Sequence, residues 1–175
     1  MKKMSETKVY TIGHSNQGFE EFLELLNKNG IKAVVDVRSN PSSRYAPQFN
    51  RDEIHKRLEE AGIEYVFMED NVVGNILGGR PKDGDCYRNG KVVYERIQGK
   101  GWYKAGISEL INIARRKKTA IMCSEKNPDK CHRHCLITQS LLNKRVSVFH
   151  ILEDGGIEKA QRDMTQTPLL AYSPL

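Results

Sequence analysis

Short apolar runs alternate with amphipathic segments along most of the chain. The apolar runs occupy residues 9–12, 31–37, 63–68, 119–122 and 147–151. Runs of this length between polar or glycine residues indicate buried β-strands. In the segments between them, apolar residues recur every three or four positions. This spacing predicts helices over 18–30, 50–62, 100–117 and 129–143, with a last helix over 157–164.

Strands that alternate with helices predict an α/β fold with a mostly parallel sheet flanked by helices. We expect a single domain over residues 1–175, with an insertion at about 69–101 that contains Gly78 and Gly79. Connections of this length in compact domains are commonly functional lids or are only partly ordered. The residues from about 165 onward show no periodicity, which predicts an irregular tail.

Polar residues follow four of the predicted strands. In an open parallel sheet, ligands bind beyond the carboxyl ends of the strands. Because alternating helices give the strands a common direction, the residues that follow them should meet at one edge. The sequence therefore predicts a polar site at this edge, formed by His14, Ser15, Asp36, Arg38, Ser39, Cys123, Ser124, Glu125 and His150, with Arg44 a little downstream.

Two carboxylates of this set are candidate catalytic groups. Asp36 lies in an apolar run, where a buried charge requires a partner. Arg38 faces the same side two residues later, so a structural ion pair is the alternative to a catalytic role. Glu125 lies in a loop at a strand end and is the other candidate for a general base or nucleophile. His14 or His132 would then transfer protons.

Other residues of the set suit an anionic ligand. Arg133 is expected in the first turn of a helix, where free N–H groups and the helix dipole attract anions. A guanidinium adds a bidentate hold on phosphate, although Arg133 could instead pair with Asp129 or Glu125. Glycine in the insertion would let the backbone approach the ligand. The expected substrate-binding residues are Ser15, Arg38, Ser39, Arg44, Gly78, Gly79, Ser124 and Arg133.

Three of the four cysteines, Cys123, Cys131 and Cys135, lie within thirteen residues. Cys123 ends a buried strand, so it is either a small core residue or a nucleophile activated by nearby cations. It lies ten positions before Arg133 with no glycine between them, which argues against a phosphatase or sulfurtransferase loop. With a histidine the three cysteines could hold a metal. No CxxC or HxxxH pair is present, and we therefore expect no cofactor.

The charge of the chain indicates the kind of partner. Its formal net charge of +6 suits an anionic small molecule or nucleic acid. The basic run at 115–118 is either the end of a helix or a nucleic-acid patch. No apolar stretch could span a membrane and the first residues do not form a signal peptide, so we expect a cytoplasmic protein with no membrane partner.

The motifs TIGHS, DVRSNPSSR, LGG, CSEKNPDKCHR and VFHI follow one another over residues 10–151. In this order they resemble the domain-of-unknown-function family 488. The resemblance implies an α/β fold and carries no settled activity. His134 and Cys135 extend the motif with a pair outside the family pattern. The resemblance marks as motif positions Thr11, Gly13, His14, Ser15, Asp36, Arg38, Pro41, Ser43, Arg44, Leu77, Gly78, Gly79, Cys123, Glu125, Cys131, His132, Arg133 and His150.

Three functions are compatible with these residues. The first is a hydrolase or group transferase that acts on a phosphate-bearing substrate, such as a nucleotide or nucleic acid, through a carboxylate. The second is a non-catalytic module that binds a nucleotide or nucleic acid in the same basic pocket. The third is a metal or thiol redox site at Cys123, Cys131 and Cys135.

Overall fold

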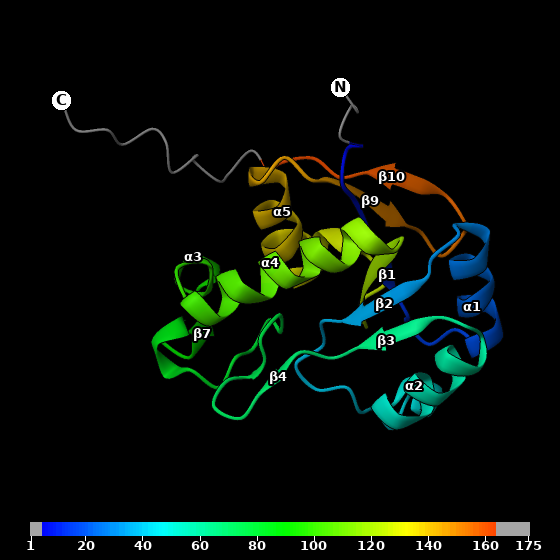
Figure 1. Ribbon diagram of the computed structural model, residues 1–175. Helices are drawn as coiled ribbons and strands as arrows, with labels where there is room; N and C mark the ends of the chain where they lie inside the picture. Colours follow the sequence, from blue (N-terminus) through cyan, green and yellow to red (C-terminus); the bar gives the residue numbers. More distant parts are fainter. Residues whose placement is uncertain (1–4, 164–175) are drawn as a thin grey trace.

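A six-stranded sheet forms the centre of the computed structural model, which describes residues 5–163 (Figure 1). Its strands are β1 (Lys8–Gly13), β2 (Ala33–Asp36), β3 (Glu64–Val66), β8 (Thr119–Cys123), β9 (Ser147–Ile151) and β10 (Ile157–Lys159). They lie in the order β10-β9-β1-β8-β2-β3, and all neighbours are parallel except β10 and β9. The predicted α/β fold with a mostly parallel sheet is confirmed.

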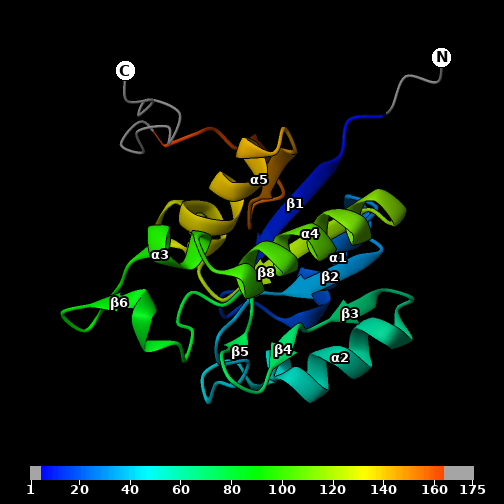
Figure 2. The same ribbon diagram turned by 60° about the vertical axis from the view of Figure 1, so that its left-hand side comes forward.

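Helices cover both faces of the sheet (Figures 1 and 2). One face is covered by α1 (Phe19–Lys28), the 3₁₀ turn η1 (Pro47–Phe49) and α2 (Arg51–Glu60). The other is covered by α4 (Gly101–Arg116), the π-helical segment η4 (Arg133–Thr138) and α5 (Gln139–Asn143). A short 3₁₀ turn, η3 (Pro128–Lys130), precedes η4.

The core follows from the alternation of side chains along each strand, because successive residues of a strand point to opposite faces. Val34 and Met122 pack with the buried side chains of α1 and α2. Val35 and Ile121 are their neighbours in sequence, and they pack with α4 and α5. A strand buried on both faces must be apolar throughout, which is why the strands read as continuous apolar runs.

The insertion forms two small hairpins and a short helix beside the carboxyl edge of the sheet (Figure 2). Asn75 attaches it to the sheet, since its Nδ2 donates to the carbonyls of Asp36 and Arg38 at 2.8 and 2.9 Å. The elements of the insertion are β4 (Glu69–Asp70), β5 (Gly74–Asn75), η2 (Gly84–Cys86), β6 (Tyr87–Arg88), β7 (Lys91–Val92) and α3 (Tyr94–Gln98).

One predicted helix is wrong. Residues 157–159 form the edge strand β10, in which Ile157 pairs with Ile151 of β9. The expected irregular tail from about residue 165 lies outside the described residues. Among the described helices, none is long and apolar enough to cross a membrane.

Candidate active site

The candidate site lies where β1, β8 and β2 end next to one another. Cys123 is the last residue of β8, and the chain then leaves the sheet as an exposed loop over residues 124–127. The loop is bonded to the end of β1. The amide of His14 donates to the carbonyl of Cys123 at 2.9 Å, and the amide of Ser15 donates to the carbonyl of Ser124 at 3.0 Å.

Arg133 holds the next part of the loop. Its side chain is 1% exposed, and its two terminal nitrogens donate to the carbonyls of Glu125 and Lys126 at 2.6 and 3.3 Å. The sequence predicted that this guanidinium binds an anion. In the structure its terminal nitrogens are hydrogen-bonded to backbone carbonyls instead. The alternative pairing with the carboxylate of Asp129 or Glu125 is also absent among the described contacts.

A buried chain of hydrogen bonds orients Arg133 from behind. His134 Nε2 donates to the carboxylate of Asp163 at 2.9 Å, and His134 Nδ1 lies 3.0 Å from His150 Nε2. His150 Nδ1 then accepts from the hydroxyl of Thr11 at 2.6 Å, and Thr11 Oγ1 accepts from Arg133 Nε at 3.3 Å. His150 belongs to the predicted site but acts here as support for the loop.

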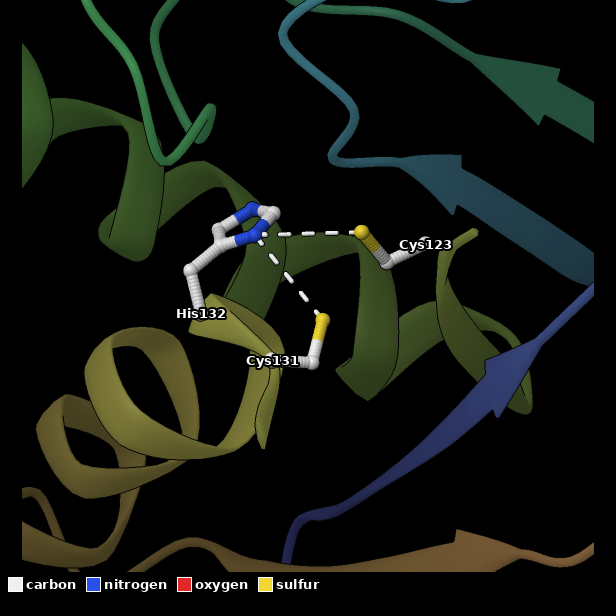
Figure 3. Close-up of side chains that lie close together, drawn as sticks. All are labelled: Cys123, Cys131 and His132. Atoms are coloured by element: carbon white, nitrogen blue, oxygen red, sulfur yellow. Dashed lines mark hydrogen bonds between the residues drawn. The ribbon is translucent and has the colours of Figure 1, made fainter. Parts of the chain in front are cut away.

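Two thiols and one imidazole meet beside the loop (Figure 3). His132 Nε2 lies 2.7 Å from the carbonyl of Val37 and 3.1 Å from that of Leu77. Carbonyls only accept, so Nε2 carries the proton and the neutral ring keeps its lone pair on Nδ1. Nδ1 lies 3.8 Å from Cys123 Sγ and 3.9 Å from Cys131 Sγ. It can therefore accept a proton from either thiol.

The surroundings of the two thiols separate their pKa values. The pKa of Cys123 is lowered to about 7, chiefly by the hydrogen bond that Cys131 donates to it, despite burial. The amides of Ser124 and Glu125 and the charge of Arg133 also contribute to this lowered pKa. The pKa of Cys131 is raised to about 12 by the same hydrogen bond and by burial. Cys123 is thus the thiol that ionises near neutral pH.

The predicted carboxylate at Asp36 lies in a closed structural network. Arg38 donates to both of its carboxylate oxygens, at 3.0 and 2.8 Å, and Tyr65 Oη donates to Oδ2 at 2.6 Å. Arg38 also donates to the carbonyl of Phe49 and faces His14 Nε2. The structure therefore shows the structural ion pair that was the alternative at this position, and Tyr65 completes it.

His14 is packed against this network. It is buried and stacks on Phe49 with 4.5 Å between ring centroids, and its Nδ1 lies 2.6 Å from the carbonyl of Ser15. Burial, with a smaller contribution from the charge of Arg38, lowers its pKa to about 4. A neutral His14 donates through Nδ1 and accepts from Arg38 through Nε2, so it positions the loop after β1.

The two glycines of the insertion pack against protein atoms. A Cβ at Gly79 would lie 2.8 Å from Cγ of the His132 ring, and a Cβ at Gly78 would lie 2.6 Å from Ser39 Oγ. Ser39 Oγ also accepts from the amide of Arg80 at 2.9 Å. Glycine at these positions lets the insertion approach closely enough for Leu77 to accept from His132.

The remaining predicted residues lie at the surface. Ser124, Glu125 and Arg44 are exposed, and Glu125 contributes its carbonyl to the contact with Arg133. Cys135 Sγ donates to the carbonyl of Asp129 at 3.3 Å and does not join the cluster of the other two cysteines. Sequence reasoning gave no role to Asn75 or Tyr65, because their partners are distant in the chain.

Cys123, Cys131 and His132 could also hold a metal ion. Their ligand atoms lie within 4.8 Å of one another, and no other such group of three occurs among the described residues. Two thiolates and an imidazole suit zinc, with one coordination position open. The bond from His132 Nε2 to a carbonyl is the outer contact that metal-bound histidines usually have. The residues present therefore fit a soft transition metal.

Comparison with known proteins gave one match. A family model described as "Domain of unknown function DUF488" matches residues 18–139, which is more than two thirds of the chain. No curated protein and no solved structure matches.

Proposed function

The chain belongs to the family DUF488, and we propose that this member is a hydrolase or group transferase with Cys123 as its nucleophile. The observation that carries the proposal is the fixed orientation of His132. Its Nε2 is bound to the carbonyls of Val37 and Leu77, and its Nδ1 faces Cys123 Sγ. A nucleophile beside a base that a third group orients is the arrangement common to covalent catalysis.

Each group then has a distinct part in the reaction. His132 Nδ1 takes the proton of the Cys123 thiol, and Cys131 donates a hydrogen bond that stabilises the thiolate. The sulfur forms a bond to the electrophilic atom of the substrate while the bond to the leaving group breaks. The leaving group takes the proton from Nδ1. Water or an acceptor molecule then releases the product and restores the thiolate.

This proposal assigns Glu125 and Asp36 no chemical step. Asp36 is closed off by Arg38 and Tyr65, and the Glu125 carboxylate is exposed at the surface. A module that only binds its ligand would need the same site but no reactive thiol. The reactivity of Cys123 therefore distinguishes the proposed enzyme from a module that only binds its ligand.

The test is the rate at which iodoacetamide alkylates each cysteine at neutral pH, followed by mass spectrometry of peptides. Cys123 should react fastest in the wild type. His132→Gln should slow it, because the base that takes the proton of the thiol is lost. Glu125→Gln is the matched control and should leave the rate within about twofold. A rate that survives His132→Gln, or one that falls with Glu125→Gln, would contradict the proposal.

A second function is favoured by the fit of the cluster to a metal. In that case the thiolates would be ligands, and alkylation would be slow until a chelator removed the ion. Elemental analysis of the purified protein decides between the two. About one zinc per chain, lost in Cys131→Ala, would support the metal site. A metal-free protein whose Cys123 reacts with or without chelator would support the nucleophile.

A further inference from the structure

The peptide groups that follow Cys123 share one orientation. The carbonyls of residues 123 and 124 accept from the amides of His14 and Ser15, and those of residues 125 and 126 accept from Arg133. His14 and Ser15 directly follow β1, and the guanidinium of Arg133, which comes from η4, lies next to Gly13 at the end of that strand. A Cβ at Gly13 would lie 1.9 Å from the carbonyl oxygen of Glu125 and 3.2 Å from Arg133 Nη2. Four successive carbonyls therefore point toward β1.

The amides of the same peptide groups point the opposite way. In a planar trans peptide the N–H is directed away from the C=O, and no cis peptide occurs among the described residues. The N–H groups of residues 124–127 are therefore directed away from β1. The first two, those of Ser124 and Glu125, donate to Cys123 Sγ. All four residues are exposed.

A row of successive backbone N–H groups is a binding site for an anion. We propose that the amides of residues 124–127 bind the terminal oxygens of a phosphate monoester, which places its phosphorus beside Cys123 Sγ. An acyl oxyanion is served by about two donors, whereas the three terminal oxygens of a phosphoryl group need more. The amides of Ser124 and Glu125, which donate to Cys123 Sγ, would be shared between the sulfur and these oxygens. This inference rests on the proposed function, because it assigns the substrate of the same nucleophile.

Arg133 is a positioning residue in this arrangement. The guanidinium lies behind the loop and holds two carbonyls, and through them it directs the amides toward the ligand. The ten-residue spacing from Cys123 argued against a compact phosphatase loop. The structure removes that objection, because the arginine does not have to reach the phosphate itself.

The reaction balances with the groups present and water. Cys123 Sγ attacks phosphorus, the S–P bond forms, and the P–O bond of the ester breaks. The departing oxygen takes the proton from His132 Nδ1. Water then attacks phosphorus and breaks the S–P bond. One of its protons passes to His132 Nδ1, and inorganic phosphate leaves.

The test is a titration with inorganic phosphate, followed by amide chemical shifts in two-dimensional NMR. Sodium chloride at equal ionic strength is the control. We expect saturable shifts concentrated at residues 124–127 in the wild type. In Cys123→Ser the dissociation constant should fall by about threefold or more, because the negative sulfur is gone. Arg133→Lys keeps the positive charge but loses the pair of terminal nitrogens that holds the two loop carbonyls. It should weaken phosphate binding about tenfold.

Two outcomes would overturn the inference. One is the absence of saturable shifts at 124–127 in both the wild type and Cys123→Ser, which does not depend on whether Arg133→Lys folds. The other is shifts confined to the basic run at 115–118. Reactive Cys123 without these shifts would refute the phosphate site alone. Phosphate binding with an unreactive Cys123 would refute the nucleophile and leave the anion site.

Discussion

At Gly13, the end of β1 and the loop after Cys123 come too close for any side chain to fit between them. A Cβ would lie 1.9 Å from the carbonyl oxygen of Glu125, which is backbone and cannot turn aside. The same carbonyl accepts from Arg133 at 2.6 Å. The shape of the loop therefore depends on the lack of a side chain at this one residue.

Gly13→Ala should displace the loop while the rest of the sheet remains folded. Overpacking of this kind typically costs about 1–3 kcal/mol, measured as the free energy of unfolding in urea. Alkylation of Cys123 should slow in the same variant. Gly18→Ala is the control, because its Cβ would come no closer than 3.9 Å to Glu21. Equal stability of the two variants would contradict this account of the loop.

Among the elements, the π-helical segment η4 sets the positions of the site residues that follow the loop. The hydroxyl of Thr138 donates to the carbonyl of Arg133 at 2.6 Å, and Gln139 Nε2 donates to that of His134 at 3.3 Å. These side chains satisfy carbonyls that the wider turn leaves without their α-helical partners. The insertion closes the other side of the site through Asn75, which binds the end of β2.

The sequence predicted the elements that bury apolar runs and the edge at which the polar residues meet. It could not predict β10, because Ile157 and its neighbours are exposed and only pairing with β9 defines the strand. It also misjudged how Arg133 is used. The acceptors of Arg133 are backbone carbonyls. Every residue has a carbonyl, so the residue types do not indicate which carbonyl will accept the hydrogen bond. Cys131 and Cys123 were recognised as a group, but their distance from His132 required the fold.

In the molecule as a whole, two histidines, His14 and His150, are buried in the neutral form. Burial lowers the pKa of His14 to about 4 and that of His150 to about 3. Both lie below the ordinary value of 6.5, so the unfolded chain binds protons that the folded chain does not. Their contribution to stability is complete above about pH 6.5 and is lost as the pH falls toward 4.

We therefore expect the free energy of unfolding to be about 2–4 kcal/mol lower at pH 5 than at pH 7.5, measured in urea. His150→Asn should have a smaller dependence on pH, because one of the two groups no longer takes up a proton on unfolding. His55→Gln is the control, since His55 is exposed, pairs with Glu59 on its own helix and stacks on Tyr65. A free energy of unfolding that stays constant between pH 5 and pH 7.5 would contradict the claim that His14 and His150 are neutral in the folded protein.

The central claim is that Cys123 is a thiolate near neutral pH within the cluster of Cys131 and His132. The most direct measurement is the dependence of the Cys123 alkylation rate on pH, in the wild type and in Cys131→Ala. The midpoint should lie at about 7 in the wild type and should rise in the variant, because the S–H donor is lost. A wild-type midpoint at the ordinary thiol value of 9.0, unchanged in Cys131→Ala, would contradict the claim.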